Sequence, residues 1–396
     1  MKKTLLTICL VWMCFSLSAQ KIIDLSGKWS FSIDRQDNGE KEKWFSHTLN
    51  DCINLPGSMP EKLKGDEVTA KTQWTGSLYD SSYYYNPYME KYRKEGNIKF
   101  PFFLTPDKHY VGAAWYQKEV NIPADWKGER ILLFLERPHI ETTVWVNGQK
   151  TGMQNSLCVP HQYDITHYVR PGKCTITIRV DNRIKEINVG PDSHSITDQT
   201  QGNWNGIVGR ICLQTTPKTY FDDIQIYPEP EQKLARVKVV IKGTGTAKVK
   251  LSAESFNTDK KHIVPAIQQE IKLNKGVTET EMVLPMGNDM LLWDEFHPAL
   301  YKLKAEVTNG KKTEIKEIQF GMRRFEIKGK WFYVNGRKTQ LRGTVENCDF
   351  PLTGYAPMDV ESWERVFRIC RSYGLNHMRF HSFCPPEAAF MAGDRG

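Results

Sequence analysis

The alternation of apolar and polar residues divides the chain into three parts. Over residues 20–218, short apolar and β-branched segments such as Arg130–Leu135 and Glu141–Val146 are separated by turn signals. The dipeptide Asn147-Gly148 suits the positive-φ positions of a tight hairpin. No long helical period interrupts these segments, so the pattern predicts a β-sandwich.

In the second part of the chain, apolar and polar residues alternate strictly with a period of two. It begins after Pro228–Glu231, a proline-rich boundary, and it recurs in Ala235–Ile241, Ala247–Ala253 and Tyr301–Val307. Such a period buries one face of a strand and exposes the other. The pattern predicts a smaller, immunoglobulin-like sandwich over residues 219–322.

The last part introduces helical spacing. Apolar residues follow a helical period from the N-cap candidate Asp359 to Gly374, a helix-stop signal. We expect strands at Thr339–Thr344 and His377–Phe380, and a hairpin at Asn335-Gly336 precedes them. A strand, a helix and a second strand form a βαβ unit, which predicts a parallel sheet.

The N-terminus has the pattern of a secretory signal peptide over residues 1–19. Lys2 and Lys3 precede the apolar run Leu5–Leu17, and small residues follow, with cleavage expected near Ala19. We therefore expect an exported protein, periplasmic or secreted. A retained anchor, or a lipid on Cys14, is the alternative. No later segment is long and apolar enough to span a membrane.

Charge and cysteine content narrow the classes of function. The formal charge of +8 is spread along the chain without a basic stripe, so we expect no nucleic-acid partner. Removing Cys9 and Cys14 from the nine cysteines leaves seven, with no CxxC pair. We predict mostly buried free thiols, with no metal and no cofactor.

One long polar stretch, Pro60–Tyr110, is rich in tyrosine. A connection of this length is often functional or mobile. The alternative is a surface excursion packed by its own aromatic side chains.

Five motifs in order carry a family resemblance. They are Asn54–Ser58 (NLPGS), Ala113–Pro123 (AAWYQKEVNIP), Thr142–Gly152 (TTVWVNGQKTG), Asp198–Leu213 (DQTQGNWNGIVGRICL) and Phe320–Gly343 (FGMRRFEIKGKWFYVNGRKTQLRG). The chain resembles glycoside hydrolase family 2, which includes β-galactosidases, β-glucuronidases and β-mannosidases.

The resemblance implies a mostly β chain of three domains. A jelly-roll sugar-binding sandwich would occupy residues 20–218, an immunoglobulin-like sandwich residues 219–322, and the start of a (β/α)₈ TIM barrel residues 323–396. A barrel needs roughly 250 residues, so we expect this one to be truncated.

The resemblance also defines what the chemistry needs. Retaining glycoside hydrolysis uses two carboxyl groups about 5 to 5.5 Å apart. In the family both belong to Glu residues on later barrel strands, and the acid/base follows Asn in an Asn-Glu dipeptide. No Asn-Glu dipeptide occurs in this sequence. We therefore assign no catalytic residue and expect an N-terminal fragment of an exported glycosidase. A non-catalytic carbohydrate-binding or accessory protein and a degenerate remnant are the alternatives.

The candidate substrate-binding residues lie at the expected strand ends. Asn347 stands where the family often has a sugar-contacting His, and Asp349 shares its loop. Arg379 matches a family Arg, whereas His381 is one position early, which leaves the sugar, anomer and linkage open. Asp198 matches a family Asp that contacts the sugar.

Each of these residues also has a structural interpretation. Asp349 could solvate a turn, Arg379 could form an ion pair, and His381 could be a hydrogen-bonded loop histidine. We place Trp115 and Trp145 in the core and leave Trp204 as core or sugar platform. The expected partner is an oligosaccharide or polysaccharide.

Overall fold

The computed structural model describes most of the chain. The signal-peptide prediction and the tyrosines Tyr79, Tyr83, Tyr84 and Tyr85 of the polar stretch lie outside the described residues. The described ranges are 20–69, 71–76, 86–98, 105–185, 193–198 and 201–396.

The first sandwich packs two antiparallel sheets. One has the order β1-β13-β8-β11 with β4 paired to β13, and the other has the order β10-β9-β12-β7-β2-β3. Both inner faces supply one continuous apolar core. The strands are β1 (Ile22–Asp24), β2 (Gly27–Asp34), β3 (Asp51–Leu55), β4 (Gly57–Ser58), β7 (Ala113–Ile122), β8 (Arg130–Pro138), β9 (Glu141–Val146), β10 (Gln149–Asn155), β11 (His161–Asp164), β12 (Gly172–Asp181) and β13 (Gly206–Thr216).

Two tryptophans show how the faces of the larger sheet are used. Trp115 and Trp145 are buried as predicted, but they form a second cluster that is separate from the main core. Their rings lie 5.0 Å apart, and Phe45 stacks on Trp145 at 5.1 Å. The segment that contains the 3₁₀ turn η1 (Trp44–Ser46) covers this cluster.

The polar stretch contains little regular structure among its described residues. It holds the pair β5 (Asp66–Glu67) and β6 (Lys108–His109) and the 3₁₀ helix η2 (Pro87–Arg93). Trp74 is buried and its ring lies 4.8 Å from that of His109. Part of the stretch therefore packs on its own aromatic side chains.

The second sandwich follows the period-two prediction closely. Its sheets have the orders β14-β15-β18 and β17-β16-β19-β20. The alternating residues of all three predicted segments are buried and meet in one core. The strands are β14 (Tyr220–Glu229), β15 (Leu234–Lys242), β16 (Gly245–Phe256), β17 (Ile263–Leu273), β18 (Val277–Pro285), β19 (Leu300–Asn309) and β20 (Lys312–Phe320). A 3₁₀ turn, η4 (Pro230–Gln232), precedes β15, and another, η3 (Ala124–Trp126), follows β7 in the first sandwich.

The last part, residues 323–396, is called the α/β segment below. A three-stranded sheet of β21 (Phe325–Lys328), β22 (Trp331–Val334) and β23 (Arg337–Thr339) comes first. The predicted hairpin at Asn335-Gly336 joins β22 and β23, with φ angles of 50° and 77°. Both values lie in the left-handed region that Asn and Gly tolerate.

The predicted βαβ unit is present, with its first strand displaced. β24 (Gly343–Glu346) pairs in parallel with β25 (His377–Phe380), and α2 (Val360–Ser372) connects them. We expected the first strand at Thr339–Thr344, but Thr339 pairs with Phe332 in the hairpin. The Asp359 carboxylate accepts a hydrogen bond from the Ser362 amide at 2.8 Å, which confirms the N-cap. A short helix, α3 (Glu387–Asp394), follows.

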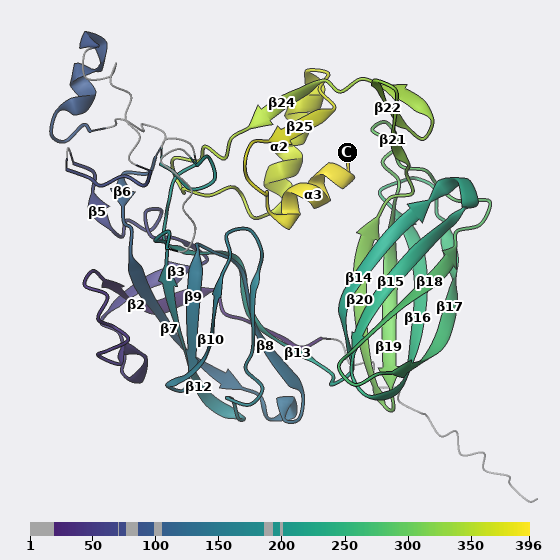
Figure 1. Ribbon diagram of the computed structural model, residues 1–396, viewed down its shortest axis with the longest axis horizontal. Helices are drawn as coiled ribbons and strands as arrows, with labels where there is room; N and C mark the ends of the chain where they lie inside the picture. Colours follow the sequence, from purple (N-terminus) through teal and green to yellow (C-terminus); the bar gives the residue numbers. More distant parts are fainter. Residues whose placement is uncertain (1–19, 70, 77–85, 99–104, 186–192, 199–200) are drawn as a thin grey trace, which may run out of the picture.

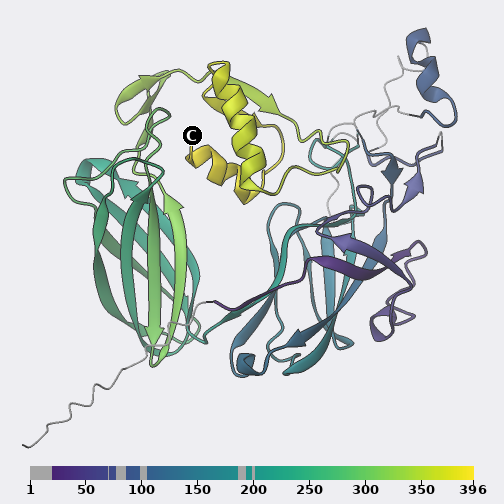
Figure 2. The same ribbon diagram turned by 180° about the vertical axis from the view of Figure 1, so that it is seen from behind.

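The α/β segment lies above and between the two sandwiches in Figure 1, and Figure 2 shows the same arrangement from behind. At the opposite end, Lys312 of β20 pairs with Glu129 of the first sandwich at 2.5 Å. All seven cysteines of the described part are unpaired, as predicted. The prediction that most are buried is wrong, because only Cys174 and Cys212, on strands of the first sandwich, are buried. None of the described helices combines the length and the hydropathy that crossing a membrane requires.

Candidate substrate-binding site

The site begins where the two parallel strands end. Asn347 follows β24 and His381 follows β25. The His381 amide donates to the Glu346 carbonyl at 2.8 Å, which continues the pairing by one residue. The His381 Nδ1 then lies 3.0 Å from the Asn347 Oδ1. Two predicted binding residues, 34 positions apart in the sequence, are therefore in contact.

The tautomer of His381 follows from this contact. An amide oxygen accepts and never donates, so the Nδ1 must carry the proton. In the neutral ring the Nε2 is then an acceptor, suited to a hydroxyl proton.

The first sandwich holds the loop that carries His381. Gln201 Nε2 donates to the His381 carbonyl at 2.6 Å, and Ser195 Oγ donates to the Ser382 carbonyl. The ring of His194 meets that of His381 at 4.8 Å, edge to face. Ser382 has a φ of 61°, a left-handed conformation that these contacts maintain.

Arg137, at the end of β8, forms hydrogen bonds with a later part of the same loop. Its Nη1 donates to the Cys384 carbonyl at 2.8 Å, and its Nη2 donates to the carbonyls of Pro385 and Cys158, each at 3.2 Å. One guanidinium thus joins the first sandwich to the loop after β25. Sequence reasoning missed Arg137, and only its charge at a strand end could have marked it.

Arg379 lies on the open face of the two-stranded sheet. Met378 and Phe380 pack with the cluster around α2, whereas Arg379, which alternates with them, is exposed. Within the part of the chain that the structure describes, Arg379 forms no hydrogen bond or ion pair. The alternative of an ion pair therefore has no partner among those residues.

Asp349 lies in the loop after β24, and Glu346 is the last residue of that strand. Asp349 lines a wide groove of about 940 Å³ that also includes Leu352 and Glu387, and burial raises its pKa. Burial also raises the pKa of Glu346, whose carboxylate accepts from the Cys348 amide at 2.6 Å. Asp349 is therefore not in the Asn347–His381 contact.

Asp198 is buried and organises the first sandwich. Its Oδ2 accepts from the Thr75 amide at 2.7 Å and lies 3.3 Å from His109 Nε2, while its Oδ1 accepts from the Asn203 amide at 3.0 Å. Both carboxylate oxygens thus have partners within that sandwich. The sugar contact expected of Asp198 stays a prediction.

Trp204 joins the first sandwich to the loop after β24. Its ring stacks on His139 at 4.4 Å and lies 5.5 Å from that of Tyr355. A Cβ on Gly354 would lie 3.3 Å from the same indole. With 6% of its surface exposed, Trp204 serves as an interface residue rather than an open platform for a sugar ring.

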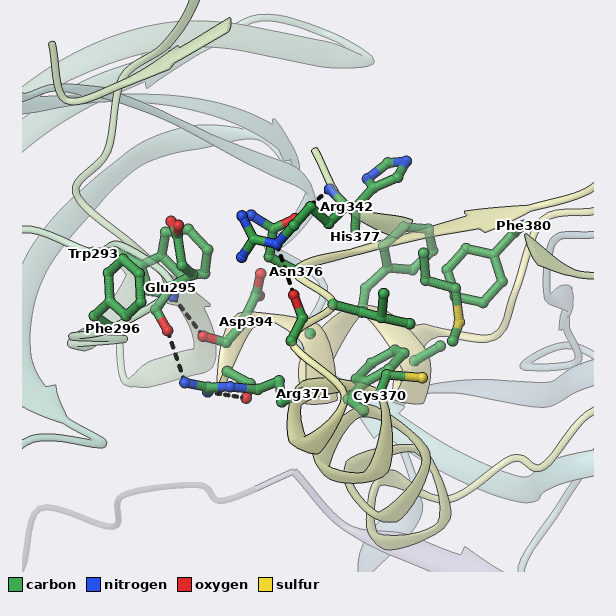
Figure 3. A pocket seen from close by; sticks show the side chains of 18 of the residues that line it. Trp293, Glu295, Phe296, Arg342, Cys370, Arg371, Asn376, His377, Phe380 and Asp394 are labelled. Atoms are coloured by element: carbon green, nitrogen blue, oxygen red, sulfur yellow. Dashed lines mark hydrogen bonds between the residues drawn. The ribbon is translucent and has the colours of Figure 1, made fainter. Parts of the chain in front are cut away.

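A second cavity lies at the opposite ends of the same strands. It measures about 430 Å³, and Arg342 and Asn376, which precede the strands, line it with Trp293 of the second sandwich. In Figure 3, Arg371 reaches the carbonyl of Glu295 at 3.0 Å, and Trp293 Nε1 donates to the Asp394 carbonyl at 2.6 Å. Sites on parallel α/β folds lie at the carboxyl ends of strands, so this cavity is a domain junction.

Metal ligation finds no support in the described ranges. No group of three or more His, Cys, Asp or Glu side chains is placed there to hold an ion. The polar groups at the strand ends are hydrogen-bonding groups, which suit hydroxyl-rich ligands.

Comparison with known families defines the class of protein. The model described as "Glycosyl hydrolases family 2, sugar binding domain" matches residues 22–217, and "Glycosyl hydrolases family 2" matches residues 219–323. The modules are thus those of a glycoside hydrolase. The chain belongs to glycosyl hydrolase family 2.

Individual relatives are distant in sequence and match between about three quarters and nearly all of the chain. Human β-glucuronidase is 23% identical over 94% of this chain and 55% of its own. A putative β-glucuronidase of Formosa agariphila is 27% identical over 74% of this chain and 34% of its own. The solved β-glucuronidase of Ruminococcus gnavus superimposes with a TM-score of 0.69 at 19% identity, over 95% of this chain and 58% of its own. The chain spans between about a third and just over half of the length of these curated relatives.

Proposed function

We propose that this chain is the N-terminal part of an exported glycoside hydrolase that cleaves terminal O-glycosidic bonds in glycans. The observation that carries the proposal is the contact between Asn347 and His381 at the carboxyl ends of two parallel strands. Family membership supplies the reaction class.

The residues divide the work of binding. His381 Nε2 accepts from a sugar hydroxyl, and the Asn347 amide group donates to a neighbouring one. Arg379, exposed on the open sheet face, pairs with a carboxylate supplied by another part of the full protein. That carboxylate and the second one required for retaining hydrolysis lie outside this sequence, because no Asn-Glu dipeptide is present.

The barrel and the export signal are part of the same proposal. The βαβ unit is the first repeat of a (β/α)₈ barrel, and residues 1–19 direct secretion before they are removed. The relatives named β-glucuronidase and β-galactosidase make glucuronides and galactosides the first substrates to test.

The test compares two proteins. The first is this chain, and the second is its product when the reading frame is extended past the codon for Gly396. We expect no turnover of nitrophenyl glycosides by the first and turnover by the second. Hydrolysis by the purified chain alone would contradict the assignment of the catalytic carboxylates elsewhere.

The non-catalytic alternative predicts a different result. A stop codon directly after Gly396, together with soluble expression and glycan-array binding that requires His381 and Asn347, would support a carbohydrate-binding protein.

A further inference from the structure

The polar stretch between Pro60 and Tyr110 has no part in the function proposed above, yet two of its described parts meet at one buried carboxylate. The backbone amide of Thr75 donates to Asp198 Oδ2 at 2.7 Å, and His109 Nε2 lies 3.3 Å from the same oxygen. An ionised carboxylate only accepts, so His109 carries a proton on Nε2. Asp198 therefore ties two separate parts of the stretch to the first sandwich.

The Asp198 carboxylate is enclosed, and both of its oxygens have partners. Only 2% of its side chain and 11% of that of His109 are exposed, and the ring of Trp74 packs edge-on against His109 at 4.8 Å. The other carboxylate oxygen, Oδ1, accepts from the Asn203 amide at 3.0 Å. A buried carboxylate with this set of donors fixes the segments that donate to it.

One of the segments that this carboxylate fixes is the segment that touches the candidate site. It consists of the described residues 193–198 and 201–203 and is called the bridging segment below. The amides of Gln201 and Gly202 both donate to the Thr197 carbonyl at 3.2 Å. These turns make the bridging segment compact, so a support at one point of it acts on the rest.

The bridging segment holds the loop after β25 on its other side. Gln201 Nε2 donates to the His381 carbonyl at 2.6 Å. Ser195 Oγ donates to the carbonyl of Ser382, the next residue. The ring of His194 meets the ring of His381 edge to face at 4.8 Å. The backbone of the candidate binding histidine is thus held from the first sandwich.

We propose that Asp198 is a positioning residue for His381. The polar stretch would brace it there through Thr75 and His109. The contacts form one continuous chain, from the stretch to the carboxylate, through the bridging segment, to the His381 carbonyl. A binding group is placed only as precisely as the groups that support it. What His381 binds rests on the proposed function, whereas the bracing is a property of this chain alone.

The ring of His381 provides a direct measurement. Its Nδ1 donates to Asn347 Oδ1, so the neutral ring should be held in the Nδ1-protonated tautomer. Nitrogen-15 NMR of the full chain, labelled at histidine, distinguishes the two tautomers. The variant His381→Gln identifies the signals that belong to this residue.

Asp198→Asn should release the brace. An amide group has one oxygen, so its NH₂ group would face one of the two backbone amides that now donate to the carboxylate. The His381 signals should move toward the tautomer mixture of a free histidine. Hydrogen exchange at the His381 amide, which donates to the Glu346 carbonyl, should become about tenfold faster.

Two substitutions of His109 separate its hydrogen bond from its packing. His109→Phe keeps a ring against Trp74 but removes the donor to Asp198. It should shift the His381 signals in the same direction and speed exchange by about two- to threefold. His109→Gln still carries a donor and should keep the His381 signals close to those of the unmodified chain.

Glu314→Gln is the matched control in the second sandwich. Glu314 is 5% exposed and accepts from the Phe221 amide at 2.6 Å, so the substitution also removes a buried carboxylate that holds a backbone amide. The control should leave the His381 tautomer unchanged, whatever it does to the stability of the chain. Circular dichroism checks that each variant is folded.

Three results would overturn the proposal. One is an unchanged His381 tautomer in Asp198→Asn. The second is an equal change in Glu314→Gln. The third is the same change in His109→Phe and His109→Gln, which would assign the effect to packing.

The bracing and the proposed function can fail separately, because none of these measurements requires hydrolysis. Turnover by the extended protein, together with an unchanged His381 in Asp198→Asn, would contradict the bracing alone. A shifted His381 without turnover by the extended protein would contradict the proposed function alone.

Discussion

The two sandwiches are similar in architecture and differ in what they bury. The second sandwich fills its core with alternating aliphatic residues, and Glu314 is the buried charged residue among those that the structure describes there. The first also buries a group of charged residues at one end of its larger sheet, among them Arg179, Asp181 and Glu141. Apolar alternation is enough to build a sandwich, whereas buried charges need specific partners. The first sandwich therefore depends on particular ion pairs as well as on apolar packing, whereas the second depends mainly on apolar packing.

The largest expected effect comes from breaking the buried charge network of the first sandwich. Asp181 is fully buried and pairs with Arg179, Arg183 and Lys185. Although burial alone would raise its pKa, hydrogen bonds from Arg183 and Lys185 hold it well below its usual range. Asp181→Ala should lower the free energy of unfolding by about 3 to 5 kcal/mol, because it leaves buried Arg179 without its closest buried partner.

Urea unfolding of the full chain, followed by circular dichroism, measures this effect. The control is Glu279→Gln, which breaks an exposed pair with Lys238 in the second sandwich. We expect the control to leave the midpoint unchanged. Equal midpoints for both variants would show that the buried network adds no stability.

The second sandwich should respond instead to loss of apolar volume. Leu251 is fully buried in its core, so Leu251→Ala should cost about 2 to 5 kcal/mol of unfolding free energy. Lys248→Ala, on the exposed face of the same strand, should have little effect. A result in which both variants behave alike would contradict the alternation of this strand.

The stability of the chain should depend on pH through His139, which stacks on the interface residue Trp204. Burial lowers the pKa of His139 to about 3, so the folded chain keeps this ring neutral. The unfolded chain takes up the proton below a pH of about 6.5, and stability must therefore fall as the pH falls through that value. Between pH 7 and pH 5 this residue alone should cost about 2 kcal/mol.

The measurement is the slope of unfolding free energy against pH. His139→Phe keeps an aromatic ring against Trp204 and should flatten the slope. His47→Phe, at an exposed position, should keep it. An unchanged slope in His139→Phe would show that His139 is not buried in a neutral form.

The smallest expected effect is local to the loop after β25. Arg137→Gln removes the donors to the carbonyls of Cys158, Cys384 and Pro385. Hydrogen exchange at the amides of residues 381–387 should become faster, by an amount that corresponds to about 1 kcal/mol. Arg236→Gln, in an exposed pair of the second sandwich, is the control and should leave this exchange unchanged.

Local signals in the sequence predicted the elements that depend on local chemistry. Asn147-Gly148 and Asn335-Gly336 form hairpin turns, because such turns need positive φ angles and Asn and Gly adopt them readily. Asp359 caps α2, and Gly374 follows its end with a φ of 77°. The prediction placed the start of the first parallel strand too early, because Thr339 pairs with Phe332 in the preceding hairpin instead.

The candidate site was predicted in part for the same reason. Asn347 and His381 were selected singly, each at the end of an expected strand, and their contact depends on the register Glu346–Phe380 of the parallel pair. The contributions of Ser195 and Gln201 had no signal in the sequence, since they arise from the packing of one domain on another.

The sequence by itself determined the two sandwiches, the βαβ unit and the family, because alternation, turn residues and ordered motifs act over short distances along the chain. The tertiary structure decided which side chains meet. It brought Asn347 into contact with His381, gave the Asp198 carboxylate hydrogen-bond partners inside the first sandwich, and placed Trp115 and Trp145 under an outer segment. Those outcomes depend on strand register and domain packing, which bring together residues that lie tens to hundreds of positions apart.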